Sequence, residues 1–241
     1  MIRILVCEDY AEVSRRAADI VAAQLSGKPD SVLGFATGST PEGMYAELAR
    51  DCGEGKISFA RARTFNLDEY YPIAPEAPCS YRRYMEENLF SRIDIDPANT
   101  HLPNGLAEDP EAEGKRYDEM IAAAGGIDLQ VLGVGRNGHI GFNEPDEVLV
   151  LGTHCTKLTP STISANSRFF ASEDEVPKRA MTMGLGTIFG AKRIILLATG
   201  AEKAEPISHL LAGELRTDCP VSLLNLHADV LLIADRAAMG E

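Results

Sequence analysis

The stretch IDLQVLGVGRNGHIGFNEP, residues 127–145, decides the fold of this chain. Its first part, 127–135, is a nearly continuous apolar run, and such a run is typical of a strand that is buried on both faces. Its second part places His139 between glycines in a turn that also carries Asn137 and Glu144. A buried strand that ends in a glycine-rich turn indicates a parallel α/β sheet, in which ligands bind where the strands end.

The same pattern recurs along the chain, and helical patterns lie between the apolar runs. Strands are expected over 2–6, 31–37, 64–67, 193–200 and 229–235, and helices over 41–50, 80–90, 109–124 and 201–212. A further helix is expected to start where Asp9 and Glu12 have the spacing of a capping box, and to end at Gly27. The alternation predicts an α/β protein with a doubly wound, mostly parallel sheet. Since no repeat, linker or shift in composition interrupts it, a single domain is expected over 1–241.

The balance of charge excludes one class of partner. The chain has a formal net charge of -13 and a pI near 4.9, and no Lys/Arg-rich run offsets it, so its field repels DNA and RNA. A small phosphorylated molecule remains compatible, because salt screens distant charges and a few local cations can outweigh them. We therefore expect a small-molecule partner and no nucleic acid.

Cysteine usage and hydropathy bear on the cellular location. The five cysteines are odd in number and widely spaced, with no C-x-x-C pair, which favours reduced thiols. The N-terminal run turns acidic after six residues, and no apolar stretch reaches the length of a membrane span. We expect a cytoplasmic protein without membrane contact.

Two loops after predicted strands carry groups that suit an anion or a base. The turn in FATGSTPEGMY offers the backbone and hydroxyl groups of Gly38, Ser39 and Thr40, with Thr40 expected as the helix N-cap. It could hold a phosphate or be a plain strand-to-helix turn. Asp68 and Glu69 follow the short strand over 64–67; they are either solvated loop charges or a base beside a carbonyl substrate.

The loop after 127–135 and two cations complete the candidate set. Glycines around His139 allow close backbone approach, which favours a functional imidazole over a structural one, and the absence of a nearby ligand pair disfavours zinc. Arg168 and Lys203 each look like surface charges when taken singly. Together with the glycine-rich turn, they could hold one phosphate dianion.

Six motifs together resemble the glucosamine-6-phosphate deaminase family, also called glucosamine-6-phosphate isomerase. They are ATGSTP, TFNLDEYY, GVGRNGHIGFNEP, NSRFF, MTMGLGTI and GAEKA, and they occur in this order over nearly the whole chain. The resemblance implies a modified Rossmann-type sheet of the sugar-phosphate isomerase/deaminase kind. It also implies conversion of D-glucosamine 6-phosphate and water to D-fructose 6-phosphate and ammonia, in the catabolism of N-acetylglucosamine, with no metal, nucleotide or redox cofactor.

The resemblance assigns roles to the motif residues. Asp68 would be the base that moves a proton between C2 and C1, and His139 would open the pyranose ring, a task for a proton shuttle near neutral pH. Asn137 and Glu144 would orient His139. The residues expected at the phosphate are Gly38, Ser39, Thr40, Arg168 and Lys203. Neither a monomer nor a homo-oligomer is favoured.

The chain departs from the family pattern at Asn137, where many relatives carry Asp. An amide can fix the imidazole by hydrogen bonding but cannot stabilise its cation by charge. Ring opening is therefore expected to rely on Glu144.

Three alternative functions remain: a galactosamine-6-phosphate deaminase, a 6-phosphogluconolactonase and a non-catalytic phosphosugar sensor. The Asn-Glu-Pro sequence and the Asp68 base disfavour the lactonase, and the retained Asp68, His139 and Glu144 disfavour the sensor.

Overall fold

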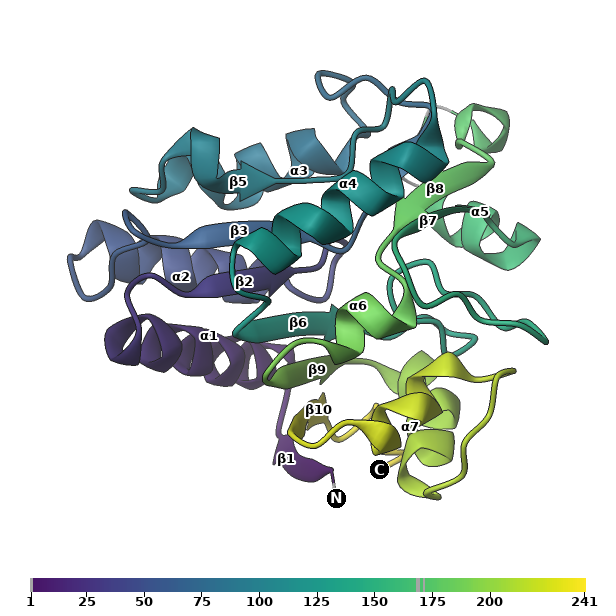
Figure 1. Cartoon of the computed structure of the whole chain (residues 1–241). Coiled ribbons are helices and arrows are strands. Elements are labelled where there is room, and N and C mark those ends of the chain that lie inside the picture. The colour runs from purple at the N-terminus through teal and green to yellow at the C-terminus, as the bar shows by residue number, and fades with distance from the viewer. Residues whose placement is uncertain (1, 168–169, 171) are drawn as a thin grey trace.

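The computed structural model describes residues 2–167, 170 and 172–241, and its centre is a seven-stranded parallel sheet (Figure 1). The strand order is β1-β10-β9-β6-β2-β3-β5, and each neighbouring pair is parallel. The strands are β1 (Arg3–Cys7), β2 (Val32–Phe35), β3 (Arg63–Asn66), β5 (Thr100–His101), β6 (Leu129–Gly133), β9 (Ile194–Ala198) and β10 (Val230–Asp235). The predicted α/β class with a mostly parallel sheet is confirmed.

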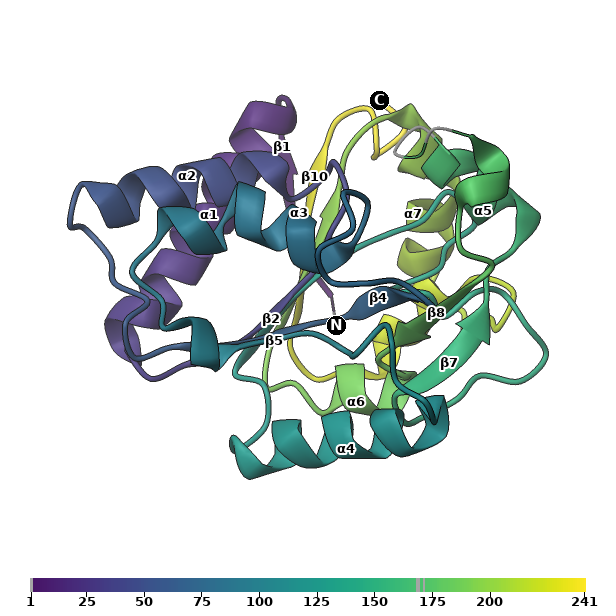
Figure 2. The ribbon, with the colours of Figure 1, turned by 90° about the horizontal axis from the view of Figure 1, so that it is seen from above.

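Helices cover both faces of this sheet (Figures 1 and 2). One face carries α1 (Tyr10–Gly27), α2 (Glu42–Gly53) and α3 (Tyr81–Asn88), and the other carries α4 (Pro110–Ala123), α6 (Leu185–Phe189) and α7 (Ala204–Leu211). Short 3₁₀ turns lie at η1 (Phe90–Arg92), η2 (Pro97–Asn99), η4 (Glu173–Glu175), η5 (Ala201–Lys203) and η6 (Pro220–Leu226). None of the helices in the described part of the chain has the length and apolar character of a transmembrane span.

Helix α1 shows how local sequence sets an element's bounds. The Asp9 side chain accepts from the backbone N–H of Glu12 at 2.8 Å, as the predicted cap requires. The Glu12 carboxylate, however, accepts from the N–H of Glu8 at 3.0 Å, one residue earlier than in a capping box. The helix then ends at Gly27 as expected.

Two apolar clusters, one on each face, bury the central strands. Leu33 and Phe35 of β2 face the cluster of α1, α2 and α3, whereas Val32 faces the cluster of α4, α6 and α7. Burial on both faces is therefore confirmed for β2, as its continuous apolar run predicted. For β1 that prediction is wrong: Ile4 is 47% exposed and Val6 is 43% exposed, because β1 is an edge strand.

A second, three-stranded sheet lies at the carboxyl end of the first and was not predicted. Its antiparallel order is β4-β8-β7, with β4 (Asp68–Tyr71), β7 (His154–Lys157) and β8 (Arg179–Thr182), and helix α5 (Pro160–Asn166) lies beside it. Each of these strands has four residues and mixes polar with apolar side chains, so they lack the apolar run that marks the others. The register pairs Asp68 with Thr182, which places Asp68 where the two sheets meet.

Candidate active site

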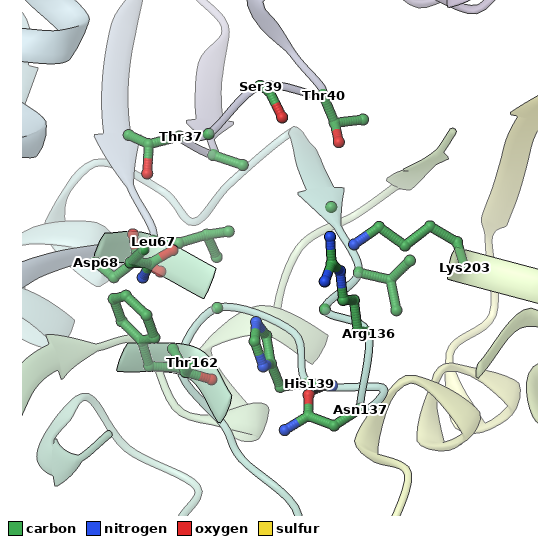
Figure 3. A pocket seen from close by; sticks show the side chains of 18 of the residues that line it. Thr37, Ser39, Thr40, Leu67, Asp68, Arg136, Asn137, His139, Thr162 and Lys203 are labelled. Carbon is green, nitrogen blue, oxygen red and sulfur yellow. Dashed lines mark hydrogen bonds between the residues drawn. The ribbon is translucent and has the colours of Figure 1, made fainter. Parts of the chain in front are cut away.

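A pocket of about 560 Å³ opens at the carboxyl ends of the parallel strands, where the loops after β2, β3 and β6 meet α5 and η5 (Figure 3). Seven of the sequence-predicted residues line it: Gly38, Ser39, Thr40, Asp68, Asn137, His139 and Lys203. Glu144 lies behind His139 and contacts it. Arg168 lies outside the described residues. The fold thus brings together residues that are far apart in the sequence.

The turn after β2 is held by tyrosine hydroxyls from three helices. Tyr45 donates to the carbonyl of Ala36 at 2.5 Å, Tyr84 donates to that of Gly38 at 2.7 Å, and Tyr10 donates to that of Ser39 at 3.1 Å. Gly38 has a φ of 98°, which favours glycine. Because these carbonyls are engaged by hydroxyls, the turn is suited to present N–H groups to an anion.

The expected capping role of Thr40 is wrong. Helix α2 begins at Glu42 with Pro41 as its N-cap residue, and no side chain caps it. The first intrahelical bond of α2 runs from the N–H of Tyr45 to the carbonyl of Pro41 at 3.0 Å, which puts the N-cap one residue after Thr40. Thr40 instead lines the pocket.

Asp68 and Glu69 are neighbours in sequence but have different environments. Asp68 lines the pocket and is 6% exposed; its burial, together with the charge of Glu69, raises the pKa of Asp68 to about 8. Glu69 accepts from the backbone N–H groups of Tyr70 at 2.9 Å, Tyr81 at 2.8 Å and Arg82 at 2.9 Å. Glu69 therefore anchors the start of α3, and Asp68 is the carboxyl group that faces the pocket.

The loop that carries His139 is a compact turn fixed to its surroundings. The N–H of Gly135 donates to the carbonyl of His139 at 2.9 Å, and the N–H of Val221 donates to the carbonyl of Gly138 at 2.8 Å. The backbone N–H of Phe142 donates to the Thr182 hydroxyl at 3.0 Å. Since Thr182 pairs with Asp68, the loop is joined to the strand that carries the other predicted catalytic residue.

The imidazole of His139 lies directly against the backbone of Gly135. A Cβ atom at Gly135 would come within 2.3 Å of the imidazole Cε1, so any side chain there displaces the ring. Gly138, with a φ of 83°, is required for its backbone conformation as well. Gly135 and Gly138, which both precede His139, are thus needed for two different physical reasons.

We expect Gly135→Ala to lower kcat by about 100-fold, because a displacement of a catalytic group by about 1 Å has effects of that order. Thermal unfolding should change little, since the imidazole can rotate toward the pocket. Gly53→Ala is the matched control, because a Cβ there meets no atom within 4 Å. Full activity of Gly135→Ala would show that the observed imidazole position is not needed.

Glu144 accepts hydrogen bonds on both carboxylate oxygens. Oε2 accepts from His139 Nδ1 at 3.2 Å and from Asn137 Nδ2 at 2.7 Å, and Oε1 accepts from the Thr162 hydroxyl at 2.5 Å. Burial alone would raise the pKa of Glu144, but the bonds from His139, Thr162 and Asn137 lower it to about 2. Glu144 is therefore an anion that can stabilise a cationic imidazole.

Asn137 belongs to the same hydrogen-bond network. Its amide donates to Glu144 and its oxygen accepts from the backbone N–H of His139 at 3.3 Å, whereas the His139 ring is bonded by Glu144. Asn137 therefore contacts the carboxylate that bonds the imidazole, and its expected role in orienting His139 stays a prediction. An Asp at this position would place a second carboxylate against Glu144.

Lys203 lies in η5, after Gly200, whose N–H donates to both oxygens of Asp235 at 3.1 Å and 3.0 Å. Figure 3 shows the side chains of Lys203 and Arg136 pointing toward one another in the pocket. Both cations line the pocket beside the turn at Gly38, and Glu202 lines it as well. The two positive charges and the N–H groups of the turn suit this region to an anion.

Sequence reasoning missed Arg136 and Thr162. Arg136 lies inside the glycine-rich motif, next to Asn137, so its position alone could have marked it. Thr162 lies in the segment TPST, whose pattern marks a helix start but not its contact with a distant carboxylate.

In the described ranges, no group of three or more His, Cys, Asp or Glu side chains is arranged to hold a metal ion.

Comparisons with known proteins agree with this geometry. The model of the family "Glucosamine-6-phosphate isomerases/6-phosphogluconolactonase" matches residues 8–233. A glucosamine-6-phosphate deaminase of Halothermothrix orenii is 56% identical over 236 residues, 98% of each chain, and one of Clostridioides difficile is 50% identical over 239 residues, 99% of this chain and 96% of the relative.

Two solved structures share the fold of this chain, but they differ in how similar their sequences are to it. A monomeric glucosamine-6-phosphate deaminase superposes with a TM-score of 0.97 at 46% identity, and the match covers 99% of both chains. A 6-phosphogluconolactonase from Trypanosoma cruzi superposes with a TM-score of 0.80 at 20% identity over 100% of this chain and 97% of that one. The second similarity is one of fold.

Proposed function

Since this chain belongs to the family of glucosamine-6-phosphate isomerases and 6-phosphogluconolactonases, we propose that it is a glucosamine-6-phosphate deaminase, which converts D-glucosamine 6-phosphate and water to D-fructose 6-phosphate and ammonia. The observation that carries the proposal is one pocket that combines Asp68, His139 with its partner Glu144, and the turn at Gly38. Relatives at 50–56% identity that bear this activity support it.

Ring opening is assigned to His139. Because Glu144 is an anion that contacts Nδ1, the proton of the neutral imidazole lies on Nδ1 and Nε2 is left as a base. Nε2 takes the proton of the anomeric hydroxyl and returns it to the ring oxygen, which yields the open-chain aldehyde. Glu144 stabilises the imidazolium that forms between these two transfers.

Isomerisation is assigned to Asp68. Its ionised carboxylate removes the C2 proton of the amino aldehyde, which gives an enolamine, and returns the proton to C1, which gives the C2 imine. Water adds to the imine carbon and ammonia leaves. A carboxylate with a pKa of about 8 is a stronger base than an ordinary carboxylate, and a pKa near neutral pH suits a general base.

Phosphate binding is assigned to the turn of Gly38, Ser39 and Thr40 and to Lys203, with Arg136 as an additional cation. Arg168 keeps its predicted role at the phosphate as part of this proposal. The tyrosine-held carbonyls of the turn and the convergence of Arg136 and Lys203 support the assignment.

Lys203→Met is expected to raise KM by about 10- to 100-fold, the effect of losing one hydrogen bond to a charged group. Inhibition by inorganic phosphate should weaken by a similar factor, and Arg136→Ala should move both constants in the same direction. Lys56→Met, at an exposed position after α2, is the control. An unchanged inhibition constant for phosphate in Lys203→Met would remove Lys203 from the phosphate site.

Two expectations about the whole chain remain predictions. We infer that residues 1–241 form a single domain, because helices on both faces share one parallel sheet. A cytoplasmic location is supported by the five cysteines, which are odd in number and widely spaced and include no C-x-x-C pair.

The test is an ammonia-release assay with glucosamine 6-phosphate and galactosamine 6-phosphate in parallel. We expect fructose 6-phosphate and ammonia in equal amounts from the first substrate. Faster release from the second, with tagatose 6-phosphate as product, would change the assigned C4 epimer. Hydrolysis of 6-phosphogluconolactone without any ammonia release from either amino sugar would instead assign the lactonase reaction.

A further inference from the structure

The hydrogen bonds to Glu144 come from two separate segments of the chain. Its Oε2 atom faces the loop after β6, where His139 Nδ1 lies at 3.2 Å and Asn137 Nδ2 at 2.7 Å. Its Oε1 atom faces the start of α5, where the Thr162 hydroxyl lies at 2.5 Å and the Thr159 hydroxyl at 3.2 Å. The carboxylate that contacts the imidazole is thus tied to a helix that lines the pocket.

The Thr162 hydroxyl is not needed to form α5. The N-cap is Thr159, whose hydroxyl accepts from the backbone N–H of Thr162 at 3.3 Å, and that bond does not involve the Thr162 side chain. The Thr162 hydroxyl accepts from Thr159 at 3.1 Å and gives its own proton to Glu144. Thr162 is 4% exposed and Glu144 is 8% exposed, so water contributes little to this contact.

Apolar contacts that do not include Thr162 hold α5 and the residues on either side of it in place. Leu158, Ile163 and Phe170 pack in one cluster with Tyr70 and Phe142. The rings of Phe170 and Tyr70 meet edge to face with their centroids 5.4 Å apart. Loss of the Thr162 hydroxyl should therefore leave the helix docked while it removes one donor from Glu144.

We propose that Thr162 is a positioning residue for proton transfer at His139: its hydroxyl holds Glu144 in the orientation in which the carboxylate faces the imidazole. A buried carboxylate adopts the orientation in which both oxygens are well hydrogen-bonded, and of the two hydroxyls near Oε1 that of Thr162 is the closer, at 2.5 Å against 3.2 Å for Thr159. Proton transfer depends in turn on the direction of the imidazole ring. The position of α5 over the pocket and the competence of His139 are therefore coupled.

This inference rests on the proposed ring-opening role of His139, and its first test is kinetic. Thr162→Val should lower kcat on the order of tenfold, the effect of losing one hydrogen bond to a charged group, with KM changed less than about threefold. Thr162→Ser should restore kcat, since serine keeps the donor. Thr156→Val, on β7 outside the pocket, is the matched control. An unchanged kcat in Thr162→Val would overturn the inference.

The second test does not depend on turnover. A proton on His139 Nδ1 that is hydrogen-bonded to a carboxylate should give a downfield ¹H NMR signal, which His139→Gln would identify by its loss. We expect the signal in the wild type and in Thr162→Ser, and a broadened or shifted signal in Thr162→Val. A Thr162→Val signal identical to the wild type would overturn the positioning role. If the wild type released no ammonia while the signal still changed, the proposed function would fail and the positioning role would stand.

Discussion

Asp68→Asn is expected to lower kcat by about 10⁴-fold, because an amide cannot accept the C2 proton and base catalysis contributes up to about that factor. Exchange of the C2 proton with solvent should be lost, while inorganic phosphate still binds, since the turn at Gly38 and Lys203 are unchanged. Asp30→Asn, at an exposed position between α1 and β2, is the control. If Asp68→Asn retained exchange, the base would have to be assigned to another residue.

The same substitution should stabilise the folded protein at alkaline pH. The folded-state pKa of Asp68, about 8, lies above its value in an unfolded chain, so folding favours the protonated form. Stability from this group is present below about pH 4 and is lost as the pH rises through about 8. Asp68→Asn cannot ionise, so near pH 8 it should exceed the wild type by about 2–4 kcal/mol in free energy of unfolding.

Urea denaturation at pH 5 and pH 8 would measure this difference, which should be small at the lower pH and large at the higher one. Activity should follow the opposite course. Because only ionised Asp68 can act as the base, kcat/KM of the wild type should rise toward pH 8. An equal difference in unfolding free energy at both pH values would contradict the raised pKa. Burial of Asp68 thus lowers the free energy of unfolding at alkaline pH and makes its carboxylate a stronger base.

His139→Gln is expected to lower kcat by about 10²- to 10⁴-fold, the range for loss of a general acid-base group. Turnover should then be limited by spontaneous opening of the sugar ring. The acyclic analogue 2-amino-2-deoxyglucitol 6-phosphate needs no ring opening, so its inhibition constant should stay close to the wild-type value. His209→Gln, on α7 and away from the pocket lining, is the control. Loss of affinity for the acyclic analogue as well would mean that His139 mainly binds substrate.

The central sheet could be predicted from sequence because its strands carry continuous apolar runs. Strand β6 and the loop at His139 follow directly from the stretch 127–145, and the helices between strands follow from their apolar stripes. The second sheet could not be predicted, since β4, β7 and β8 are short and lack an apolar run. Their pairing also joins segments that are far apart in the sequence. Edge position, which exposes Ile4 and Val6, likewise depends on strand order and not on local composition.

The site, like the fold, has features that could be predicted from the sequence and contacts that could not. Motif positions placed Asp68, His139 and the Gly38 turn in one pocket, where the structure has them. The contact of Asn137 with Glu144, and that of Thr162 with the same carboxylate, depend on side-chain directions and on a helix that docks from elsewhere in the chain. Spacing along the sequence carries no information on such contacts.

The most direct test of the whole account follows glucosamine 6-phosphate that carries deuterium at C2, by NMR, in ordinary water. Proton transfer from C2 to C1 by Asp68, after ring opening by His139, predicts that deuterium leaves C2 and appears at C1 of fructose 6-phosphate or in the solvent, with one ammonia per fructose 6-phosphate. Substrate that keeps its C2 deuterium and releases no ammonia, under conditions in which the protein is folded and binds phosphate, would contradict it.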